Sequence, residues 1–456
     1  MEIGRENKFA LAAILVLPVF ASVYYALAMP VSFDEAWTFL NFTQKGFAES
    51  VTHYPAPNNH VLHSLVTNVT YYIPFLSDLM KLRLPSIFIS LASLLLLYRF
   101  VSKHFDIKTA LVVVGVSSVF FLNIYYSYMS RGYSLVSLCF IAALYSAFNI
   151  VKADNEKRNW MYFSAFSIIG FFTMPSFLYP FITLNFFILV SRHKNLRLQV
   201  ISTAITGICV LLLYLPIICH DGIMAIIHNR YVTPIGFAAT ATGLFPYFGN
   251  AITEITGIHW AIIVLLLIVG VGFLYKSKEK LLLSFALIMI LSPVILLLVH
   301  RLLPFSRVFN YYSVVFILLI VLPYRSLLQK TGLKAIIVLI LLLQGLFVFN
   351  FNSKIEAYED KDLAINITAS KVIPKIIGDY RYLFNFVLLE SNLEFELVSK
   401  GYKNYSIKSV GIPNMSTDTI SGYDFIIINT EFDQTKNSKV FYATPYYNIY
   451  KKSQGN

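Results

Sequence analysis

The sequence predicts a mainly α-helical polytopic membrane protein with a small mixed α/β domain at its C-terminus. Hydrophobic residues make up 57% of the 456 positions and charged residues only 13%, whereas a soluble domain carries roughly 25% charged residues. A soluble fold of this composition would expose large apolar patches, so a lipid bilayer is the solvent that fits. Apolar runs recur through the first 350 residues, and from about residue 351 charges become frequent between short apolar runs.

The apolar runs are long enough to cross a bilayer, because about 20 residues at 1.5 Å per residue span its hydrocarbon core. The run 9–29 follows two basic residues and has no small-residue cleavage site after it, so we interpret it as a retained signal anchor. The stretch 160–190 is too long for one straight span and contains two prolines, so we expect a hairpin of two short helices. About 11 transmembrane helices result: 9–29, 84–100, 109–128, 133–151, two within 160–190, 199–219, 259–275, 281–300, 308–324 and 335–350.

The basic residues predict the orientation. With the N-terminus cytoplasmic, the cytoplasmic segments before residue 351 hold 17 Lys and Arg residues and the outer segments hold 7, as the positive-inside rule requires. The outer ones are Lys45, Lys81, Arg83, Arg131, Arg230, Arg301 and Arg307. An odd number of spans puts the C-terminal domain outside. We therefore expect a multi-pass protein of the cell inner (plasma) membrane, and we interpret the net charge of +12 as loop charge rather than a nucleic-acid surface.

Two domains are expected. Residues 1–350 form the transmembrane domain, whose long outer loops 30–83 and 220–258 are expected to pack as amphipathic juxtamembrane helices on the outer face. Residues 351–456 form a soluble extracytoplasmic α/β domain. The three cysteines lie in or beside apolar runs, which argues against a disulfide framework and a cysteine zinc site. The chain also has no Walker loop or dinucleotide glycine fingerprint.

Ionisable residues beside the spans on the outer face are the first candidates for a site. A charge at membrane depth costs free energy, so a functional role is the first explanation for its presence. Asp34 and Glu35 follow the first span, just after Ser32. A carboxylate there can act as a general base or hold a cation. Alternatively, Ser32 caps a helix whose N2 and N3 positions the two acids occupy. His60 and His63 lie one helical turn apart, so both can face one pocket as a hydrogen-bonded pair or as metal ligands.

Arginines on the outer face are exceptions to the excess of basic residues in the cytoplasmic segments, and binding of an anionic ligand would explain their presence there. Arg131 lies at an outer turn among serines and tyrosines that include Tyr133, and Arg301 and Arg307 lie near another outer turn. Arg83 stands at the mouth of the second span, where an arginine can also simply reach toward the interface. Together with the acids and histidines, these residues predict one site in which arginines hold a lipid-linked phosphate while a carboxylate activates an acceptor hydroxyl.

These segments resemble the C-type (GT-C) membrane glycosyltransferases of the protein O-mannosyltransferase and aminoarabinose-transferase superfamily, in its bacterial branch. The resemblance covers about the first 325 residues in order and topology. Members often carry proline after the first loop histidine, where this chain has Val61. The matching segments are Phe33-Asp34-Glu35-Ala36, Asn59-His60-Val61-Leu62-His63-Ser64-Leu65, Arg83-Leu84-Pro85-Ser86, Ser130-Arg131-Gly132-Tyr133-Ser134-Leu135, and Arg307 with Tyr311.

The resemblance implies the GT-C fold and transfer of a single sugar, hexosyl or pentosyl, from a polyprenyl-phosphate donor to a hydroxyl or lipid-linked acceptor, with inversion, on the extracytoplasmic face. Such a reaction belongs to cell-envelope glycan, lipid or protein glycosylation. The implied partners are that donor, a lipid, glycan or protein acceptor and membrane lipids, with no nucleic acid. The implied site has Asp34 and Glu35 as catalytic residues and a set of donor-phosphate or substrate-binding residues: Arg131, Arg307, Arg301, His60, His63, Arg83 and Tyr133.

Two points stay open in the sequence. Some members of the resembled family use a divalent metal near the acid and others do not, so a metal near Asp34 is unassigned and no other cofactor is expected. The alternative function is a transporter or flippase of a lipid-linked saccharide. Such a protein would place charged residues along a path through the membrane and show symmetry between its halves, and it would not need an acidic pair at the outer face.

Overall fold

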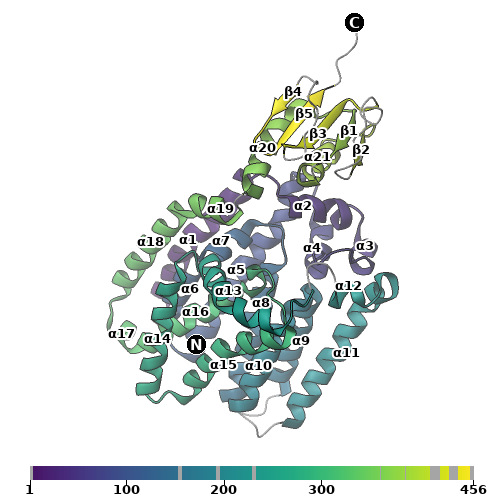
Figure 1. The fold of residues 1–456 in the computed structure, drawn as a ribbon. Coiled ribbons are helices and arrows are strands. Elements are labelled where there is room, and N and C mark those ends of the chain that lie inside the picture. The colour runs from purple at the N-terminus through teal and green to yellow at the C-terminus, as the bar shows by residue number, and fades with distance from the viewer. Residues whose placement is uncertain are drawn as a thin grey trace.

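Helices follow one another along the chain to Ile376, and a five-stranded sheet with one further helix follows them (Figure 1). The computed structural model describes residues 4–152, 157–191, 196–228, 233–359, 361–385, 387–410, 422–430 and 440–451. The sheet and its helices sit on one end of the helical bundle, which we call the domain end.

The predicted spans coincide with helices. By length and composition, six helical segments in the described ranges can cross a membrane: α1 (Arg5–Ala28), α5 (Asp78–His104), α8 (Tyr133–Lys152), α11 (Leu196–Asp221), α15 (Lys280–His300), and Tyr312–Lys330, which comprises α16 (Tyr312–Val321), η5 (Leu322–Tyr324) and α17 (Arg325–Lys330). The number rises to eight if two bent pairs each count as one span: α6 (Ile107–Ser117) with α7 (Phe121–Tyr128), and α13 (Phe237–Thr256) with α14 (Trp260–Lys276).

The remaining predicted spans are short helices. The stretch 160–190 forms two helices, as expected, with a break at its first proline, and the last predicted span is a 17-residue helix. These elements are α9 (Lys157–Thr173), η2 (Pro175–Phe177), α10 (Leu178–Ser191) and α18 (Leu333–Phe349). The short helices are apolar around most of their circumference and pack with the longer ones into one hydrophobic core.

The connections that the excess of basic residues predicts to be cytoplasmic contact one another in the structure. The Nζ of Lys108, at the start of α6, donates hydrogen bonds to the carbonyls of Gln329, in the last turn of α17, and Thr331, which directly follows that helix. Arg325 forms an ion pair with Glu279, between α14 and α15. These three connections therefore lie on the same side of the bundle, away from the domain end.

The long loops 30–83 and 220–258 fold into short helices. Figure 1 shows α2, α3 and α4 at the domain end, below the C-terminal domain, with α12 beside them. The loop elements are α2 (Phe33–Thr38), a π-helical turn η1 (Phe39–Thr43), α3 (Phe47–Thr52), α4 (Val61–Tyr71), α12 (Met224–Ile227) and α13. A 3₁₀ turn, η4 (Ser306–Phe309), follows α15. The expectation that these loops pack as juxtamembrane helices agrees with this arrangement.

The C-terminal domain is a mixed α/β unit, as predicted. Its strand order is β2-β1-β3-β5-β4; β1 is parallel to β2 and β3, whereas β5 is antiparallel to β3 and β4. The parallel connection from β1 to β2 passes through α21, which is the usual way to link parallel neighbours. The elements are α19 (Phe351–Glu359), α20 (Lys361–Ile376), β1 (Arg381–Phe384), α21 (Val387–Ser399), β2 (Ser406–Ser409), β3 (Phe425–Asn429), β4 (Val440–Ala443) and β5 (Tyr447–Lys451).

Two contacts hold this domain on the bundle. In α19, Phe351 and Ile355 are buried in the core of the transmembrane helices, while the domain's own core begins with Ile365 in α20. In α21, Phe395 packs with Phe39 and its neighbours above α2, their rings 5.0 Å apart. The α/β domain is thereby placed directly over the short helices of the domain end.

Candidate active site

A cavity of about 310 Å³ opens at the domain end, and we call it the Asp34 cavity. It lies where α2, the turn after α7, α13, η4, α19 and α20 meet, so segments far apart in the sequence share its wall. The lining residues are Ser32, Phe33, Asp34, Tyr125, Tyr126, Met129, Arg131, Glu254, Phe305, Ser306, Arg307, Tyr358 and Asn366.

The start of α2 sends the two neighbouring acids in different directions. Ser32 is the N-cap; its Oγ accepts a hydrogen bond from the Glu35 N–H at 3.3 Å, and its own N–H donates to Glu35 Oε2 at 3.1 Å. This capping box holds Glu35 against the helix end. Asp34, one position earlier, lines the cavity with 30% of its side chain exposed. Ser32 thus caps the helix, as the alternative interpretation predicted, and only Asp34 faces the cavity.

Glu35 and Arg83 form a fully buried ion pair beneath the cavity. Arg83 Nε donates to Glu35 Oε1 at 2.9 Å and Nη2 donates to Oε2 at 2.6 Å, with both side chains 0% exposed. The Ser130 N–H adds a hydrogen bond of 2.9 Å to Oε1. The remaining guanidinium N–H groups donate to backbone carbonyls at the end of α1 and beyond it: Ala26, Met29 and Pro30. The pair therefore joins α1, α2, α5 and the turn that carries Arg131.

The environment of Glu35 keeps it ionised. Burial alone would raise the pKa of its carboxyl, but the Arg83 guanidinium and the N–H groups of Ser130 and Ser32 hold that pKa below its usual value. A carboxylate with its oxygens already occupied and no solvent contact has no route to a substrate proton. Glu35 and Arg83 pair with each other and do not line the cavity, and the catalytic and substrate-binding roles expected of them stay predictions.

Arg131 reaches Asp34 from the turn between α7 and α8. Its Nη2 lies 3.7 Å from Asp34 Oδ2, and its side chain is 4% exposed. Nη1 donates to Thr38 Oγ1 and to the Asn58 carbonyl, both at 3.2 Å. These contacts fix the guanidinium beside α2. Its Nε–H is buried and has no acceptor among the described residues, so one donor of this group is unsatisfied in the structure.

His60 lies behind Arg131 and does not line the cavity. The Gly132 N–H donates to its Nδ1 at 2.7 Å, so in the neutral ring the proton sits on Nε2. The distance of 3.4 Å from Nε2 to Arg131 Nη2 then joins two donors and is a packing contact. Burial lowers the pKa of His60 well below its usual value, and the nearby Arg131 charge adds to this. His60 is therefore neutral, and its Nδ1 is not free to bind a metal.

His63 supports the same turn from further below. Ser86 Oγ donates to the Met129 carbonyl at 2.7 Å and so accepts from His63 Nε2 at 3.2 Å. Burial lowers the pKa of His63 to about 3, with Arg131 contributing. The expectation that His60 and His63 face one pocket is thus replaced by two separate supporting contacts to the turn 129–132.

Arg307 provides the second cation. Its Nη1 lies 3.8 Å from Asp34 Oδ2, and its side chain is 31% exposed. The guanidinium stacks on the Phe305 ring at 4.6 Å. Like that of Arg131, its Nε–H is buried without an acceptor among the described residues. The Asp34 carboxylate therefore faces two guanidinium groups, each with one unsatisfied buried N–H.

Two other predicted residues have different positions. Tyr133 is buried behind the cavity, with its ring 5.0 Å from the His60 ring and 4.4 Å from that of Tyr126, which does line it. Arg301 ends α15 in the left-handed conformation, with φ 56°, and its carbonyl accepts from the Ile235 N–H. Its side chain is exposed and does not line the cavity.

Several lining residues had no signal in the sequence. Glu254 of α13 contacts Ser306 Oγ through a short hydrogen bond and lines the cavity beside Arg307. Tyr126 of α7 and Tyr358 of α19 place their hydroxyls 3.3 Å apart at its wall. Glu254 belongs to no motif that the sequence shows, and single tyrosines cannot be told from an aromatic belt.

The Asp34 cavity offers a poor set of metal ligands. Two guanidinium groups lie within 4 Å of the Asp34 carboxylate, and they would have to leave before a divalent cation could bind the same oxygen. Among the described residues, the grouping of three His, Cys, Asp or Glu ligands lies elsewhere, at His53, His220 and Asp221. A metal near Asp34 thus stays a prediction that this arrangement does not favour.

Known structures share this fold. ArnT from Cupriavidus metallidurans in the apo state superposes with a TM-score of 0.56 at 13% identity, over 97% of both chains. The same protein bound to undecaprenyl phosphate gives 0.56 at 12%. The archaeal oligosaccharyltransferase AglB from Archaeoglobus fulgidus, in complex with an inhibitory peptide and a dolichol-phosphate, gives 0.53 at 12%, over 93% of this chain and 70% of that one. No family model and no curated protein sequence matches the chain.

At these identities the likeness concerns the fold. The chain shares the GT-C fold with ArnT and AglB, and it carries a small C-terminal domain with a mixed sheet. The fold class predicted from the sequence is confirmed.

Proposed function

We propose that the protein is a glycosyltransferase that moves a single hexosyl or pentosyl group from a polyprenyl-phosphate donor to a hydroxyl or lipid-linked acceptor in the Asp34 cavity. The observation that carries this proposal is the arrangement of one carboxylate, Asp34, between two guanidinium groups, Arg131 and Arg307, in a cavity at one end of a membrane helix bundle. The fold adds support, since the solved structures that share it include ArnT bound to undecaprenyl phosphate and AglB in complex with a dolichol-phosphate.

The arrangement suits a displacement at the anomeric carbon. Asp34 accepts the proton of the acceptor hydroxyl, the acceptor oxygen forms a bond to the anomeric carbon, and the bond from that carbon to the donor phosphate oxygen breaks. The configuration inverts because the acceptor attacks opposite the leaving group. The lipid phosphate leaves with the electron pair of the broken bond, so it needs positive charge nearby rather than a general acid.

Arg131 and Arg307 provide that charge. Each approaches Asp34 at a distance longer than a hydrogen bond and retains a buried Nε–H, so a phosphate can add charge-assisted hydrogen bonds to both. Once the guanidinium groups turn to the phosphate, Asp34 loses two stabilising partners and becomes a better base at the moment when the acceptor is present. Tyr125, Tyr126 and Tyr358 offer aromatic faces and hydroxyls for the sugar.

The proposal includes the orientation. With the basic connections cytoplasmic, the domain end and the C-terminal domain lie outside the inner membrane, where the donor would be consumed in glycosylation of a cell-envelope glycan, lipid or protein. In this proposal Asp34 is the catalytic residue and Arg131 and Arg307 bind the phosphate. The positioning residues are Glu35, Arg83, His60 and His63.

Asp34→Asn is the direct test. It keeps the shape of the side chain and removes the base, so we expect loss of sugar transfer by about 10²-fold or more, with unchanged insertion and unfolding temperature. The assay is transfer of radiolabelled sugar from synthetic polyprenyl-phosphate donors in membranes. Asp78→Asn is the matched control, since Asp78 pairs with Lys81 outside the cavity lining and should retain full transfer.

Arg307→Ala tests the phosphate contact. Arg307 is more exposed than Arg131, so its removal harms folding less, and loss of a charged hydrogen bond of about 1.5–3 kcal/mol should raise the donor KM at least tenfold. Full transfer activity in Asp34→Asn would refute the catalytic assignment. If transfer is undetectable in the wild type and in every variant, while lipid-linked saccharide crosses vesicles in an Arg307-dependent way, the protein is a transporter instead.

A further inference from the structure

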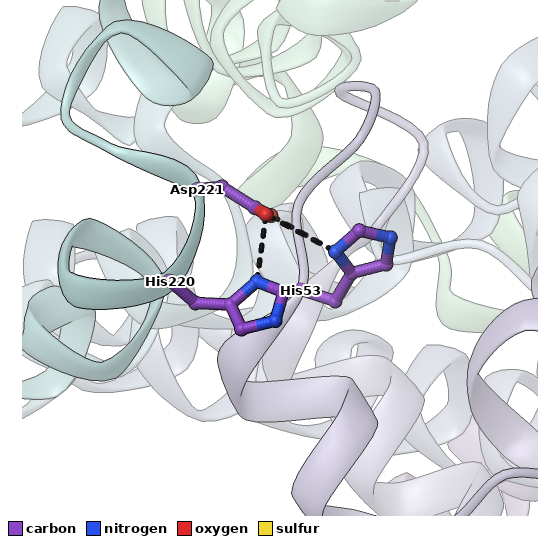
Figure 2. A group of neighbouring side chains, drawn as sticks. All are labelled: His53, His220 and Asp221. Carbon is purple, nitrogen blue, oxygen red and sulfur yellow. Dashed lines mark hydrogen bonds and ion pairs between the residues drawn. The ribbon is translucent and has the colours of Figure 1, made fainter.

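A second group of ligand-type side chains lies at the domain end, outside the Asp34 cavity. His53 follows α3, and His220 and Asp221 end α11, so two distant segments contribute. Figure 2 shows both imidazole rings turning Nδ1 toward the Asp221 carboxylate. One ligand atom from each residue lies within 4.8 Å of the other two. We infer that His53, His220 and Asp221 form a binding site for a divalent transition metal of the Zn²⁺ class.

The donor set suits that metal. Two imidazole nitrogens and one carboxylate oxygen, with the fourth position left to water, are a known set of ligands for four-coordinate zinc. Zinc bonds of about 2.0–2.2 Å at tetrahedral angles require ligand atoms about 3.3 Å apart. His53 Nδ1 already lies 3.1 and 3.2 Å from the two Asp221 oxygens. His220 Nδ1 lies 2.7 Å from Oδ1 and needs only a small rotation of an exposed ring.

The backbone around the ligands is fixed. The Tyr54 N–H donates a short hydrogen bond to the second oxygen of Asp221, and a partner of this kind orients a metal-binding carboxylate. Buried Asn59 donates to the carbonyl of His53 at 3.0 Å. Beneath the site, Tyr54 packs with Tyr214 and Ile217 of α11 in a small apolar cluster. Only His220, 57% exposed, is free to adjust.

A metal here would join two parts of the protein. It would tie the loop 53–60 to the end of α11, and its binding free energy would add to the packing of Tyr54 on that helix. That loop also carries Asn58, whose carbonyl accepts from Arg131. The metal would therefore fix the loop that contacts Arg131, although it would not itself contact Asp34.

Without metal, the same three side chains can form a hydrogen-bonded group, in which each imidazole donates Nδ1–H to the carboxylate. The two states differ in what Nδ1 does: a metal needs its lone pair, and a hydrogen bond needs its proton. Zn²⁺ and protons compete for the same imidazole lone pairs, so Zn²⁺ binding must weaken at low pH, whereas a purely hydrogen-bonded group would take up no Zn²⁺.

The test uses the purified full-length protein after removal of metal with a chelator. Isothermal titration with Zn²⁺ should give one site per chain, and the apparent unfolding temperature should rise with Zn²⁺. Replacing bound metal with Co²⁺ should give the visible absorption of a four-coordinate site. His220→Ala, at an exposed position, and Asp221→Asn, which retains an acceptor for Tyr54, should each weaken Zn²⁺ binding about tenfold or more. His259→Ala, which changes another exposed histidine at a helix end, should bind as the wild type does.

The inference is overturned if the wild type takes up no more Zn²⁺ than the His220→Ala variant, or if the Co²⁺ spectrum is the same in both. Binding and unfolding are measured without the sugar-transfer assay, so the inference and the proposed function can fail separately. Loss of transfer in Asp34→Asn with normal Zn²⁺ uptake supports both.

Discussion

Glu35→Gln tests whether the two adjacent carboxylates divide their roles as the structure indicates. The change keeps the size of the side chain and removes its charge. It leaves the Arg83 guanidinium buried without a counter-ion and turns an amide NH₂ toward one of its donors. Breaking a buried ion pair from one side costs about 3–5 kcal/mol. Three carbonyl oxygens still accept from Arg83, so we expect a loss of about 3 kcal/mol.

Asp34→Asn should behave oppositely. Asp34 is 30% exposed and its two ion pairs are 3.7 and 3.8 Å long, so screening by solvent keeps their contribution to stability at about 0.5 kcal/mol or less. The expected pattern is a lowered unfolding temperature with Glu35→Gln and an unchanged one with Asp34→Asn, while the loss of transfer per folded molecule is largest in Asp34→Asn.

The assay is thermal unfolding of detergent-purified protein by intrinsic fluorescence, followed by transfer activity normalised to the folded fraction. Glu49→Gln is the matched control, because the same chemical change removes an exposed pair with Lys45 at 3.8 Å and should leave both measurements unchanged. A Glu35→Gln protein that unfolds at the wild-type temperature yet transfers no sugar would show that Glu35 takes part in the chemistry, and the assignment of roles would have to be exchanged.

Two further predictions concern the turn that carries Arg131. Burial lowers the pKa of His63 to about 3 in the folded protein, whereas a histidine in the unfolded chain has a pKa of about 6.5. Between these two pH values the unfolded state binds more protons than the folded state. The free energy of unfolding should therefore fall as the pH drops below about 6.5, by up to roughly 1.4 kcal/mol per pH unit. His63→Gln should reduce that slope in unfolding measured from pH 7 to pH 4, and an unchanged slope would contradict the assignment. Gly132→Ala would put a Cβ 2.8 Å from both the His60 Cβ and the Thr173 Cγ2, so it should displace His60 and lower both the unfolding temperature and kcat; a variant that matches the wild type in both would show that His60 does not hold the turn.

The sequence was sufficient to predict much of this protein. The apolar runs indicated each helix of the bundle, the prolines of 160–190 indicated the break between α9 and α10, and the change near residue 351 indicated the mixed domain. These features follow from short-range properties, since whether a segment of about 20 residues meets lipid or water depends on its own side chains. The motifs around Asp34 and Arg131 were found in the same way, together with the resemblance that the fold has since confirmed.

The partners of the ionisable residues were decided by the tertiary structure alone. Neighbouring Asp34 and Glu35 carry equal charge and similar size, yet the capping box turns one beneath α2 to Arg83 and leaves the other between Arg131 and Arg307. His60 contacts the turn 129–132, and His63 contacts it through Ser86. Arg301 lies outside the Asp34 cavity, whereas Glu254 of α13 lines it. The His53, His220 and Asp221 group likewise exists only because α11 ends beside α3. The physical reason is that composition and periodicity report the solvent that a residue meets, whereas an ion pair or a ligand set depends on distances of a few ångströms between distant segments, which only packing determines.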